Sequence, residues 1–248
     1  MVKTPGEIDA IAASGAVLAA CHDAVAGAVA PGVSTADLDA VAEEFIRAHG
    51  GVPSFKGYQG YPASICASVN DEVVHGIPGS RVLRAGDIIA VDIGVTLDGW
   101  VSDAARTHPV GEISPIARRL IDRTRVSLER GIEACRVGNH LGDIGHAVQS
   151  EVEAAGFSVV RSLVGHGVGR AMHEPPQVPN YGRPGGGQRL QEGWVIAIEP
   201  MVNIGDHEVI MGDDGWTISS KDASLSAHWE HTVAVTADGP RILTLPVG

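Results

Sequence analysis

The sequence predicts an α+β fold of two pseudo-symmetric halves, in which a curved antiparallel sheet is flanked by helices. An order of two helices followed by strands occurs twice along the 248 residues. The stretch GDIIAVD at 86–92 matches GWVIAIE at 193–199, and the pattern of glycines, acids and apolar residues at 32–50 matches that at 138–156. The two matches have offsets of 107 and 106 residues, and this nearly shared offset indicates an internal repeat.

The two copies are predicted to form a single domain. No stretch rich in Pro, Gly and Ser separates them, so we expect one domain over 1–248, with halves of about 1–110 and 111–248. The 32 glycines are scattered through periodic segments without a G-X-Y repeat, which predicts many tight turns. A chain of this length is sufficient to bury a large core.

Four helices are expected from apolar periodicity and from their start and stop residues. The first is rich in Ala and is stopped by Pro31-Gly32. It carries His22 and Asp23, so we expect a packed helix and not a membrane span. The second begins at a capping-box-like Ser34-Thr35-Ala36-Asp37 and ends at Gly50-Gly51. The expected ranges are 5–30, 35–49, 113–136 and 141–155.

Runs of apolar and β-branched residues predict the strands. Two of these runs are joined by Leu97-Asp98-Gly99-Trp100, which predicts a hairpin because Asp-Gly is a common two-residue hairpin turn. Such a hairpin would fold Asp103 back beside Asp92 on the neighbouring strand. The expected strand ranges are 64–69, 87–95, 101–108, 157–164, 193–202, 207–211 and 228–236.

Composition and charge exclude several classes of protein. Lys and Arg number 18 against 30 Asp and Glu, a formal net charge of −12 that disfavours non-specific binding to nucleic acids and to anionic membranes. Cys21, Cys66 and Cys135 form an odd set without a C-x-x-C pair, which argues against a disulfide framework and against a thiolate zinc site. The opening MVKTPGEID has no apolar signal-peptide region. We therefore expect a cytoplasmic protein.

The repeat places a carboxylate at the same position in both copies. Asp92 and Glu199 each follow four apolar residues, a pattern typical of a buried strand. Burial of an unpaired carboxylate is strongly unfavourable, so two of them facing each other would need a cation or a shared proton between them. The alternative is a pair of strand-end carboxylates that point to solvent.

Three further residues extend this pair. Asp103 lies in VSDA, Glu230 in HWEHTV and His166 between glycines in GHGVG. Taken singly, Asp103 and Glu230 are also consistent with surface charges on a hairpin and on an edge strand. Together, four carboxylates and one histidine form an oxygen-rich ligand set that suits two adjacent divalent ions of the Mn, Fe, Co or Zn type. Because two-metal sites generate a bridging hydroxide that attacks the substrate, the pattern favours a metallohydrolase.

Five segments carry a family resemblance: NDEVVHGIP at 70–78, Asp92 with Asp103, GHGVGR…HE at 165–174, IEPMV at 198–202 and EHT at 230–232. They resemble the type I methionine aminopeptidases, and the resemblance extends from Lys3 to Thr236. It implies the pita-bread fold of that family, which agrees with the repeat. The spacing of 33 residues from His166 to Glu199 leaves no room for the helical insertion of the type II enzymes. The chain thus resembles the short bacterial form.

The resemblance implies a role for each of these residues. Asp103 and Glu230 would bridge two divalent ions, and Glu199 would also transfer a proton from the attacking hydroxide. His173 would hydrogen-bond to the scissile amide or the developing oxyanion, and His75 would act at the substrate nitrogen. The implied catalytic residues are His75, His173 and Glu199, and the implied metal ligands are Asp92, Asp103, His166, Glu199 and Glu230.

The resemblance also implies a pocket for a methionine side chain, because a flexible thioether makes favourable contacts with aromatic rings. Core packing is the alternative for these side chains. Phe55 and Met172 stand at positions that vary in the family, and we expect them to alter the pocket slightly without excluding a thioether. The implied pocket residues are Tyr58, Tyr61, Cys66 and Trp216, with His75 and His173 also binding substrate.

Two accessory groups are expected near the metal ligands. His228 and His231 flank Glu230 and are candidates for hydrogen bonds to the ligands. The resemblance further implies a monovalent cation near Asn70 and Ser226.

The implied activity is removal of the initiator methionine from nascent polypeptides that have a small uncharged second residue and a deformylated N-terminus. The expected partners are therefore polypeptide N-termini, with ribosome association left open. We expect a monomer with no specific nucleic-acid sequence and no membrane as partner. The alternatives are a proline-specific peptidase of the same fold, a metal-free enzyme similar to creatine hydrolase, and a binding protein without activity. The presence of all five ligand residues argues against the metal-free enzyme and the binding protein, and a proline-specific peptidase is expected to carry a large further N-terminal domain.

Overall fold

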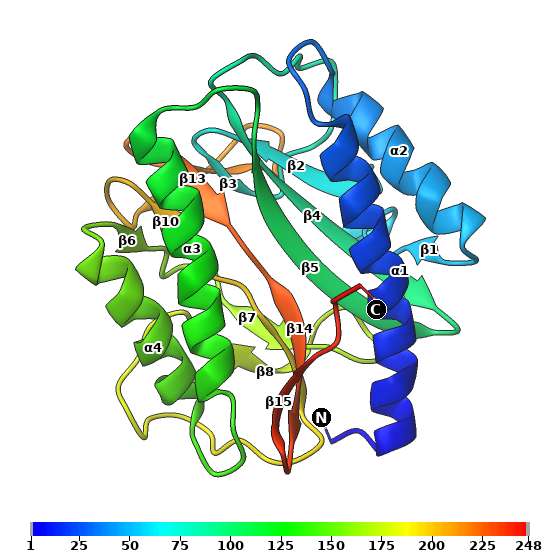
Figure 1. Ribbon diagram of the computed structural model, residues 1–248, viewed down its shortest axis with the longest axis vertical. Helices are drawn as coiled ribbons and strands as arrows, with labels where there is room; N and C mark the ends of the chain where they lie inside the picture. The colour runs from blue at the N-terminus through cyan, green and yellow to red at the C-terminus, as the bar shows by residue number, and fades with distance from the viewer. Residues whose placement is uncertain (1, 247–248) are drawn as a thin grey trace.

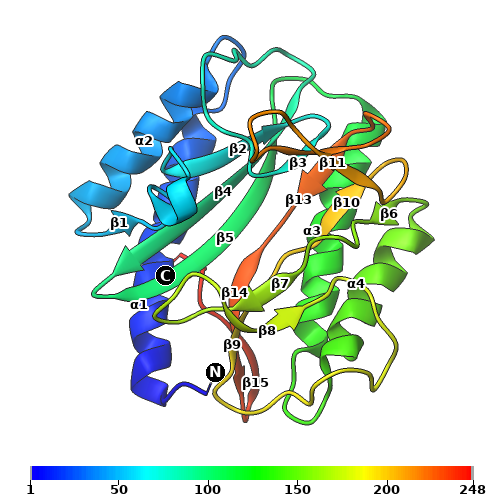
Figure 2. The same cartoon turned by 180° about the vertical axis from the view of Figure 1, so that it is seen from behind.

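The protein is described by a computed structural model that covers residues 2–246; residues 1, 247 and 248 of the expected domain lie outside the described residues. Two helix pairs flank a central set of strands, with α1 and α2 on one side and α3 and α4 on the other (Figure 1). Seen from behind, the strands lie in front of the helices (Figure 2). The helices are α1 (Pro5–Ala28), α2 (Thr35–Ala48), α3 (Pro115–Ala134) and α4 (Leu141–Ala154), with a short 3₁₀ helix at Tyr58–Gly60.

The strands pair in antiparallel fashion in four hydrogen-bonded sheets, with orders β1-β4-β2 (β5 also pairing with β4), β13-β10-β6, β11-β12-β3 and β15-β14-β9-β7-β8. The predicted α+β class is therefore confirmed, although hydrogen bonding divides the expected joined sheet into four parts. The strands are β1 (Val52–Pro53), β2 (Ile65–Val69), β3 (Glu72–Val74), β4 (Ile88–Leu97), β5 (Trp100–Pro109), β6 (Ser158–Val159), β7 (Gly165–Gly167), β8 (Glu174–Val178), β9 (Val195–Ile198), β10 (Met201–Asn203), β11 (Val209–Met211), β12 (Ile218–Ser220), β13 (Ser226–His228), β14 (His231–Thr236) and β15 (Gly239–Ile242).

The internal repeat appears in the structure as matching helix ends. Helices α2 and α4 occupy equivalent places in the two halves and both have 14 residues. The chain leaves α2 through Gly50 and α4 through Gly156, whose φ angles are +76° and +75°. Glycine adopts this left-handed conformation without the steric cost that a side chain brings. The equivalent glycines therefore end both helices in the same way, and the predicted pseudo-symmetry is confirmed.

The predicted hairpin at 97–100 is also confirmed. Asp98 and Gly99 form its turn with φ angles of +50° and +75°, as a type I′ turn requires. Strand β5 returns along β4 with Asp103 opposite Gly94. Because alternate residues of a strand share a face, Asp92 and Asp103 lie on the same face of the hairpin, one step apart.

Two predicted strands, 193–202 and 228–236, are each interrupted in the middle. The first is broken at Glu199-Pro200 and the second at Trp229-Glu230, and these breaks lie opposite each other in the ladder. Pro200 has no N–H to donate there, while the N–H of Glu230 turns to the carbonyl of Ala105 on β5, at 2.9 Å. The break therefore connects the second half of the chain to the first.

The prediction of a strand over 157–164 is wrong for most of its length. Only Ser158–Val159 pair with β10, and the chain then leaves the sheet. Ser162, Leu163 and Val164 line a cavity instead. Alternating apolar residues do not distinguish a strand from such a cavity wall, which is also half apolar.

Helix α1 is long and apolar enough to cross a membrane by length and composition alone. In the fold it packs on the β4–β5 hairpin. Ser14 donates a hydrogen bond to the carbonyl of Val95 at 2.8 Å, and the ring Nε2 of His22 lies 2.9 Å from the carbonyl oxygen of Ala104. Its buried residues include Ile11, Leu18 and Val25. We interpret α1 as a core helix, in agreement with the prediction from its sequence.

Candidate metal centre

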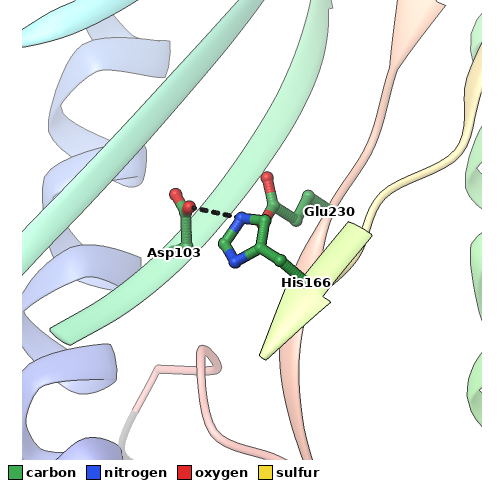
Figure 3. A group of neighbouring side chains, drawn as sticks. All are labelled: Asp103, His166 and Glu230. Carbon is green, nitrogen blue, oxygen red and sulfur yellow. Dashed lines mark ion pairs between the residues drawn. The ribbon is translucent and has the colours of Figure 1, made fainter. Parts of the chain in front are cut away.

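Three of the five predicted ligands meet at the centre of the molecule. Asp103 comes from β5, His166 from β7, and Glu230 from the break between β13 and β14 (Figure 3). Their ligand atoms all lie within 4.8 Å of one another. The Nε2 atom of His166 is 3.6 Å from Oδ2 of Asp103. All three side chains are buried.

The remaining two predicted ligands adjoin this group. The Nε2 atom of His166 is also 3.6 Å from Oε1 of Glu199. Asp92 lies two residues along β4 from Gly94, which pairs with Asp103, so the two carboxylates are neighbours on one face of the hairpin. The two repeat-related carboxylates, Asp92 and Glu199, thus adjoin Asp103 and His166 respectively. The alternative in which these carboxylates point to bulk solvent is wrong, because Oδ1 of Asp92 is buried, the Glu199 side chain is only 13% exposed, and both residues line a cavity.

The electrostatics of the cluster follow from burial. Removal from water raises the pKa values of Asp92, Glu199 and Glu230 well above their ordinary values, and neighbouring carboxylates raise them further. Burial lowers the pKa of His166 to about 4, so its ring is neutral near pH 7 and has a lone pair to offer a cation. The raised pKa values favour the protonated carboxyl groups, and a divalent ion would displace such protons.

Several ligand atoms in this cluster have no hydrogen-bond partner within residues 2–246. Oδ1 of Asp92, Oδ1 of Asp103 and Oε1 of Glu230 are buried and unpaired. The Nδ1 atom of His166 lies 2.9 Å from the carbonyl oxygen of Gly167, which leaves Nε2 directed at the carboxylates. Unpaired buried oxygens and one neutral imidazole fit divalent metal ions, which take carboxylate and imidazole ligands of this type.

The cluster lies beside a cavity of about 420 Å³. All four predicted pocket residues line it, and the Tyr61 ring meets the Trp216 ring edge to face at a centroid distance of 5.1 Å. Burial and the nearby Asp92 raise the pKa of the Cys66 thiol well above its ordinary value, so it is a protonated wall residue. The predicted pocket residues in the wall are Tyr58, Tyr61, Cys66 and Trp216.

The two predicted catalytic histidines also face this cavity. Nδ1 of His173 lies 2.9 Å from the hydroxyl of Tyr58, and its ring centroid is 4.2 Å from that of His166. His75 has a φ angle of +60°, a strained conformation that tends to occur at functional sites. Burial lowers the pKa values of both His75 and His173, which favours neutral rings.

Sequence reasoning identified His228 and His231 as equal candidates, and the structure separates them. Nε2 of His228 is unpaired and lies 3.9 Å from Glu199 and 3.8 Å from Glu230. His231 has its Nδ1 atom 2.8 Å from the hydroxyl of Thr244. Strand alternation was the available signal, because His228 and Glu230 are two residues apart whereas His231 is adjacent.

Sequence analysis did not identify three further apolar residues of the cavity as pocket residues, although two of them lie within the quoted motifs. Val74, Leu163 and Met201 complete the apolar wall. Phe55 also lines the cavity, whereas Met172 packs with it in the core near Gly94. These residues come from separate segments and are brought together by the tertiary fold.

The expected monovalent-cation residues, Asn70 and Ser226, are adjacent in the structure. The backbone N–H of Ser226 donates a hydrogen bond to the carbonyl of Asn70 at 2.8 Å. Asn70 has a φ angle of +62°, and its side chain contacts Asp87.

Comparison with known proteins agrees with this geometry. The model of metallopeptidase family M24 matches residues 9–237. The chain belongs to metallopeptidase family M24. The methionine aminopeptidase of Clostridium perfringens is 53% identical over 245 residues, covering 99% of this chain and 98% of that protein. The crystal structure of the methionine aminopeptidase from Rickettsia prowazekii superposes with a TM-score of 0.97 at 42% identity, covering 99% of each chain.

This M24 peptidase is thus a metallo-exopeptidase of the methionine aminopeptidase group, as the motifs implied, and its pita-bread fold is confirmed. The family depends on divalent metal, in agreement with the buried donor cluster. The prolidase from Pyrococcus horikoshii has a TM-score of 0.81 at 20% identity, which shows a shared fold. The match covers 64% of the prolidase chain, so the prolidase contains further structure that this match does not include.

Proposed function

We propose that this peptidase removes the initiator methionine from nascent polypeptides at a centre of two divalent metal ions. The observation that carries the proposal is the cluster of unpaired carboxylate oxygens at Asp92, Asp103 and Glu230, beside a cavity with aromatic walls. Asp92, Asp103, His166, Glu199 and Glu230 would supply enough donor atoms for two ions. When bound, the ions would lower the pKa of a water molecule and polarise the scissile carbonyl.

The residues of the chain have separate parts in this reaction. Asp92, Asp103, His166, Glu199 and Glu230 would hold the metal ions. Glu199 lies between His166 and His228 and would accept the proton of the attacking water and pass it on. Nδ1 of His173 lies at the Tyr58 hydroxyl, so Nε2 would be free to donate a hydrogen bond to the oxygen of the scissile carbonyl. His75 would hydrogen-bond to the substrate on the nitrogen side.

The cavity accounts for the proposed substrate. A methionine side chain is flexible, and its sulfur makes favourable contacts with rings such as those of Tyr61 and Trp216. The apolar side chains of Val74, Leu163 and Met201 would surround its methylene groups. A free α-amino group would approach the acidic cluster, and a formyl group would remove its charge and basicity. We therefore infer a requirement for a deformylated N-terminus. The preference for a small uncharged second residue is proposed from the resemblance to the methionine aminopeptidases alone.

The working form of the protein is part of this proposal. We infer a cytoplasmic monomer that meets N-termini as they are made, without a membrane or a specific nucleic-acid sequence as partner. Co, Mn, Fe and Zn all suit the ligand set. A monovalent cation at Asn70 and Ser226 would stabilise the loops that meet there.

The test is release of methionine from Met-Ala-Ser by metal-stripped protein, with Co or Mn titrated back. We expect release only with metal, and none from formyl-Met-Ala-Ser. Asp103→Ala should be inactive with an unchanged far-UV circular dichroism spectrum. Peptides with Gly, Val, Leu or Lys as second residue would show the size and charge preference.

Two outcomes would contradict the proposal. Preferential cleavage of peptides with Pro as second residue, with no release from Met-Ala-Ser, would indicate a proline-specific peptidase. Tight metal binding without release from any peptide would indicate a binding protein that has kept the ligands.

A further inference from the structure

A partly buried ion pair joins the N-terminal segment to the loop that carries His173. Nζ of Lys3 lies 2.6 Å from Oε2 of Glu174, and the two side chains are 8% and 18% exposed. Lys3 itself is held by the backbone, because its N–H donates to the carbonyl of Gly193 at 2.7 Å. Its neighbour Val2 forms a β-bridge with Trp194. The ammonium group of Lys3 is therefore a fixed point in the fold, just before β9.

The second oxygen of Glu174 closes the turn that precedes His173. Oε1 accepts hydrogen bonds from the backbone N–H groups of Arg170 at 2.9 Å and of Ala171 at 3.3 Å. Gly169 packs against the side chains of Glu174 and Lys3. A Cβ atom at that position would come within 2.4 Å of Oε1 of Glu174 and 2.6 Å of Nζ of Lys3. The absence of a side chain at 169 is what leaves space for the ion pair.

The same turn is attached on its other side to the hairpin that carries Asp92 and Asp103. The guanidinium of Arg170 stacks over the Trp100 ring, 3.8 Å from its centroid, and contacts the carbonyl oxygens of Asp98 and Gly99. The backbone N–H of Val101 donates to the carbonyl of Gly169 at 2.8 Å. The loop is thus attached to Lys3 on one side and to the β4–β5 hairpin on the other.

We propose that Lys3 and Glu174 are positioning residues that fix His173 for the reaction. The proposal rests on the proposed function, in which His173 contacts the scissile group. His173 directly precedes Glu174, and its ring must lie both at the Tyr58 hydroxyl and above His166. A charge-assisted pair on one side and a stacked guanidinium on the other restrict the loop to that geometry. A misplaced catalytic group reduces turnover much more than it reduces stability.

The experiment compares Lys3→Met with Lys221→Met, which removes an exposed lysine paired with Glu208. In Lys3→Met we expect kcat on Met-Ala-Ser to fall about tenfold while KM changes less than about twofold. Lys3→Arg, which retains the charge, should recover most of the loss. Lys221→Met should match the wild type in both constants.

The decisive comparison repeats Lys3→Met in a His173→Ala background. If Lys3 acts through His173, its removal should change the residual activity less than about twofold there. An equal fold loss in both backgrounds would overturn the proposal, because a general loss of stability acts regardless of His173.

Hydrogen exchange separates this proposal from the proposed function. The amides of Arg170 and Ala171 should exchange at least about tenfold faster in Lys3→Met than in wild type. Their exchange rates should be unchanged in Lys221→Met. If the wild type releases no methionine, the proposed function fails, while faster exchange would still show that the pair holds the loop. Unchanged exchange at residues 168–174 would overturn the positioning role in either case.

Discussion

The hydroxyl of Thr232 on β14 accepts a hydrogen bond from the N–H of Asp103 at 2.9 Å and donates one to the carbonyl of the same residue at 2.7 Å. Thr107 on β5 makes the corresponding pair of bonds with the backbone of His228, at 2.9 and 2.8 Å. At these two points a threonine hydroxyl makes the two hydrogen bonds that the backbone of a neighbouring strand makes in a sheet. The two halves are therefore hydrogen-bonded at the backbone of Asp103, a predicted metal ligand, and at the backbone of His228. We call these four bonds the joint; they fix the backbone at both residues.

The first prediction concerns this joint. Thr232→Val conserves shape but leaves the N–H and carbonyl of Asp103 buried without partners, so we expect the free energy of unfolding to fall by about 1–3 kcal/mol. Urea unfolding monitored by circular dichroism measures it. Thr236→Val on the same strand removes a half-buried hydroxyl bond to Gly239 and should cost less. Equal losses in the two variants would show that the joint has no special importance.

The second prediction separates a metal ligand from a structural carboxylate. Asp92→Asn should weaken Mn²⁺ binding by about 100-fold or more in calorimetric titration. Loss of a residue that only hydrogen-bonds to a metal ligand costs about 10–100-fold in metal affinity, and loss of a ligand carboxylate should cost at least as much. The metal-free protein should not lose stability, because one of several repelling buried acids has been neutralised. Asp98→Asn in the exposed hairpin turn is the matched control and should bind Mn²⁺ as wild type does. A loss of stability without a loss of affinity would assign Asp92 to the fold alone.

The third prediction concerns acid stability. Burial lowers the pKa of His22 well below 6.5, and neighbouring Arg106, His108 and His231 lower it further. The unfolded chain therefore binds a proton below about pH 6.5 that the folded protein does not, so the free energy of unfolding falls as the pH falls through this window. One such group contributes a slope of up to about 1.4 kcal/mol per pH unit.

His22→Gln removes this titration while an amide N–H can still reach the carbonyl of Ala104. Between pH 6 and 5 its free energy of unfolding should depend on pH less steeply than that of the wild type. Parallel curves for wild type and His22→Gln would show that His22 is protonated in the folded state.

The fourth prediction tests the methionine pocket. Trp216→Ala removes an aromatic wall, so KM for Met-Ala-Ser should rise about tenfold or more, since single apolar contacts in such pockets are worth 10–200-fold. The change in kcat should be smaller, because Trp216 is not one of the predicted metal ligands or catalytic residues and its ring contacts Tyr61. Tyr181→Ala, which truncates an exposed aromatic residue, should leave both constants unchanged. An unchanged KM in Trp216→Ala would exclude this wall from substrate binding.

Much of the fold followed from local patterns. The 106-residue offset between Gly50 and Gly156 predicted two equivalent helix ends, and their φ angles agree within one degree. The Asp98-Gly99 turn predicted the register of β4 and β5 because only a few turn types close a two-residue hairpin. The prediction of a strand over 157–164 was wrong because residues 162–164 line a cavity. Local hydropathy does not distinguish such a cavity wall from a strand.

The sequence by itself determined the repeat and the hairpin, because each depends on residue types at short or regular spacing. It also singled out the five predicted ligands, through the carboxylates of the repeat and the motifs of the family resemblance. Tertiary structure decided which of His228 and His231 faces the acids, how Thr232 and Thr107 join the halves, and that Lys3 reaches Glu174 from 171 positions away. These contacts link segments that are far apart along the chain. They depend on packing geometry, which short-range patterns do not encode.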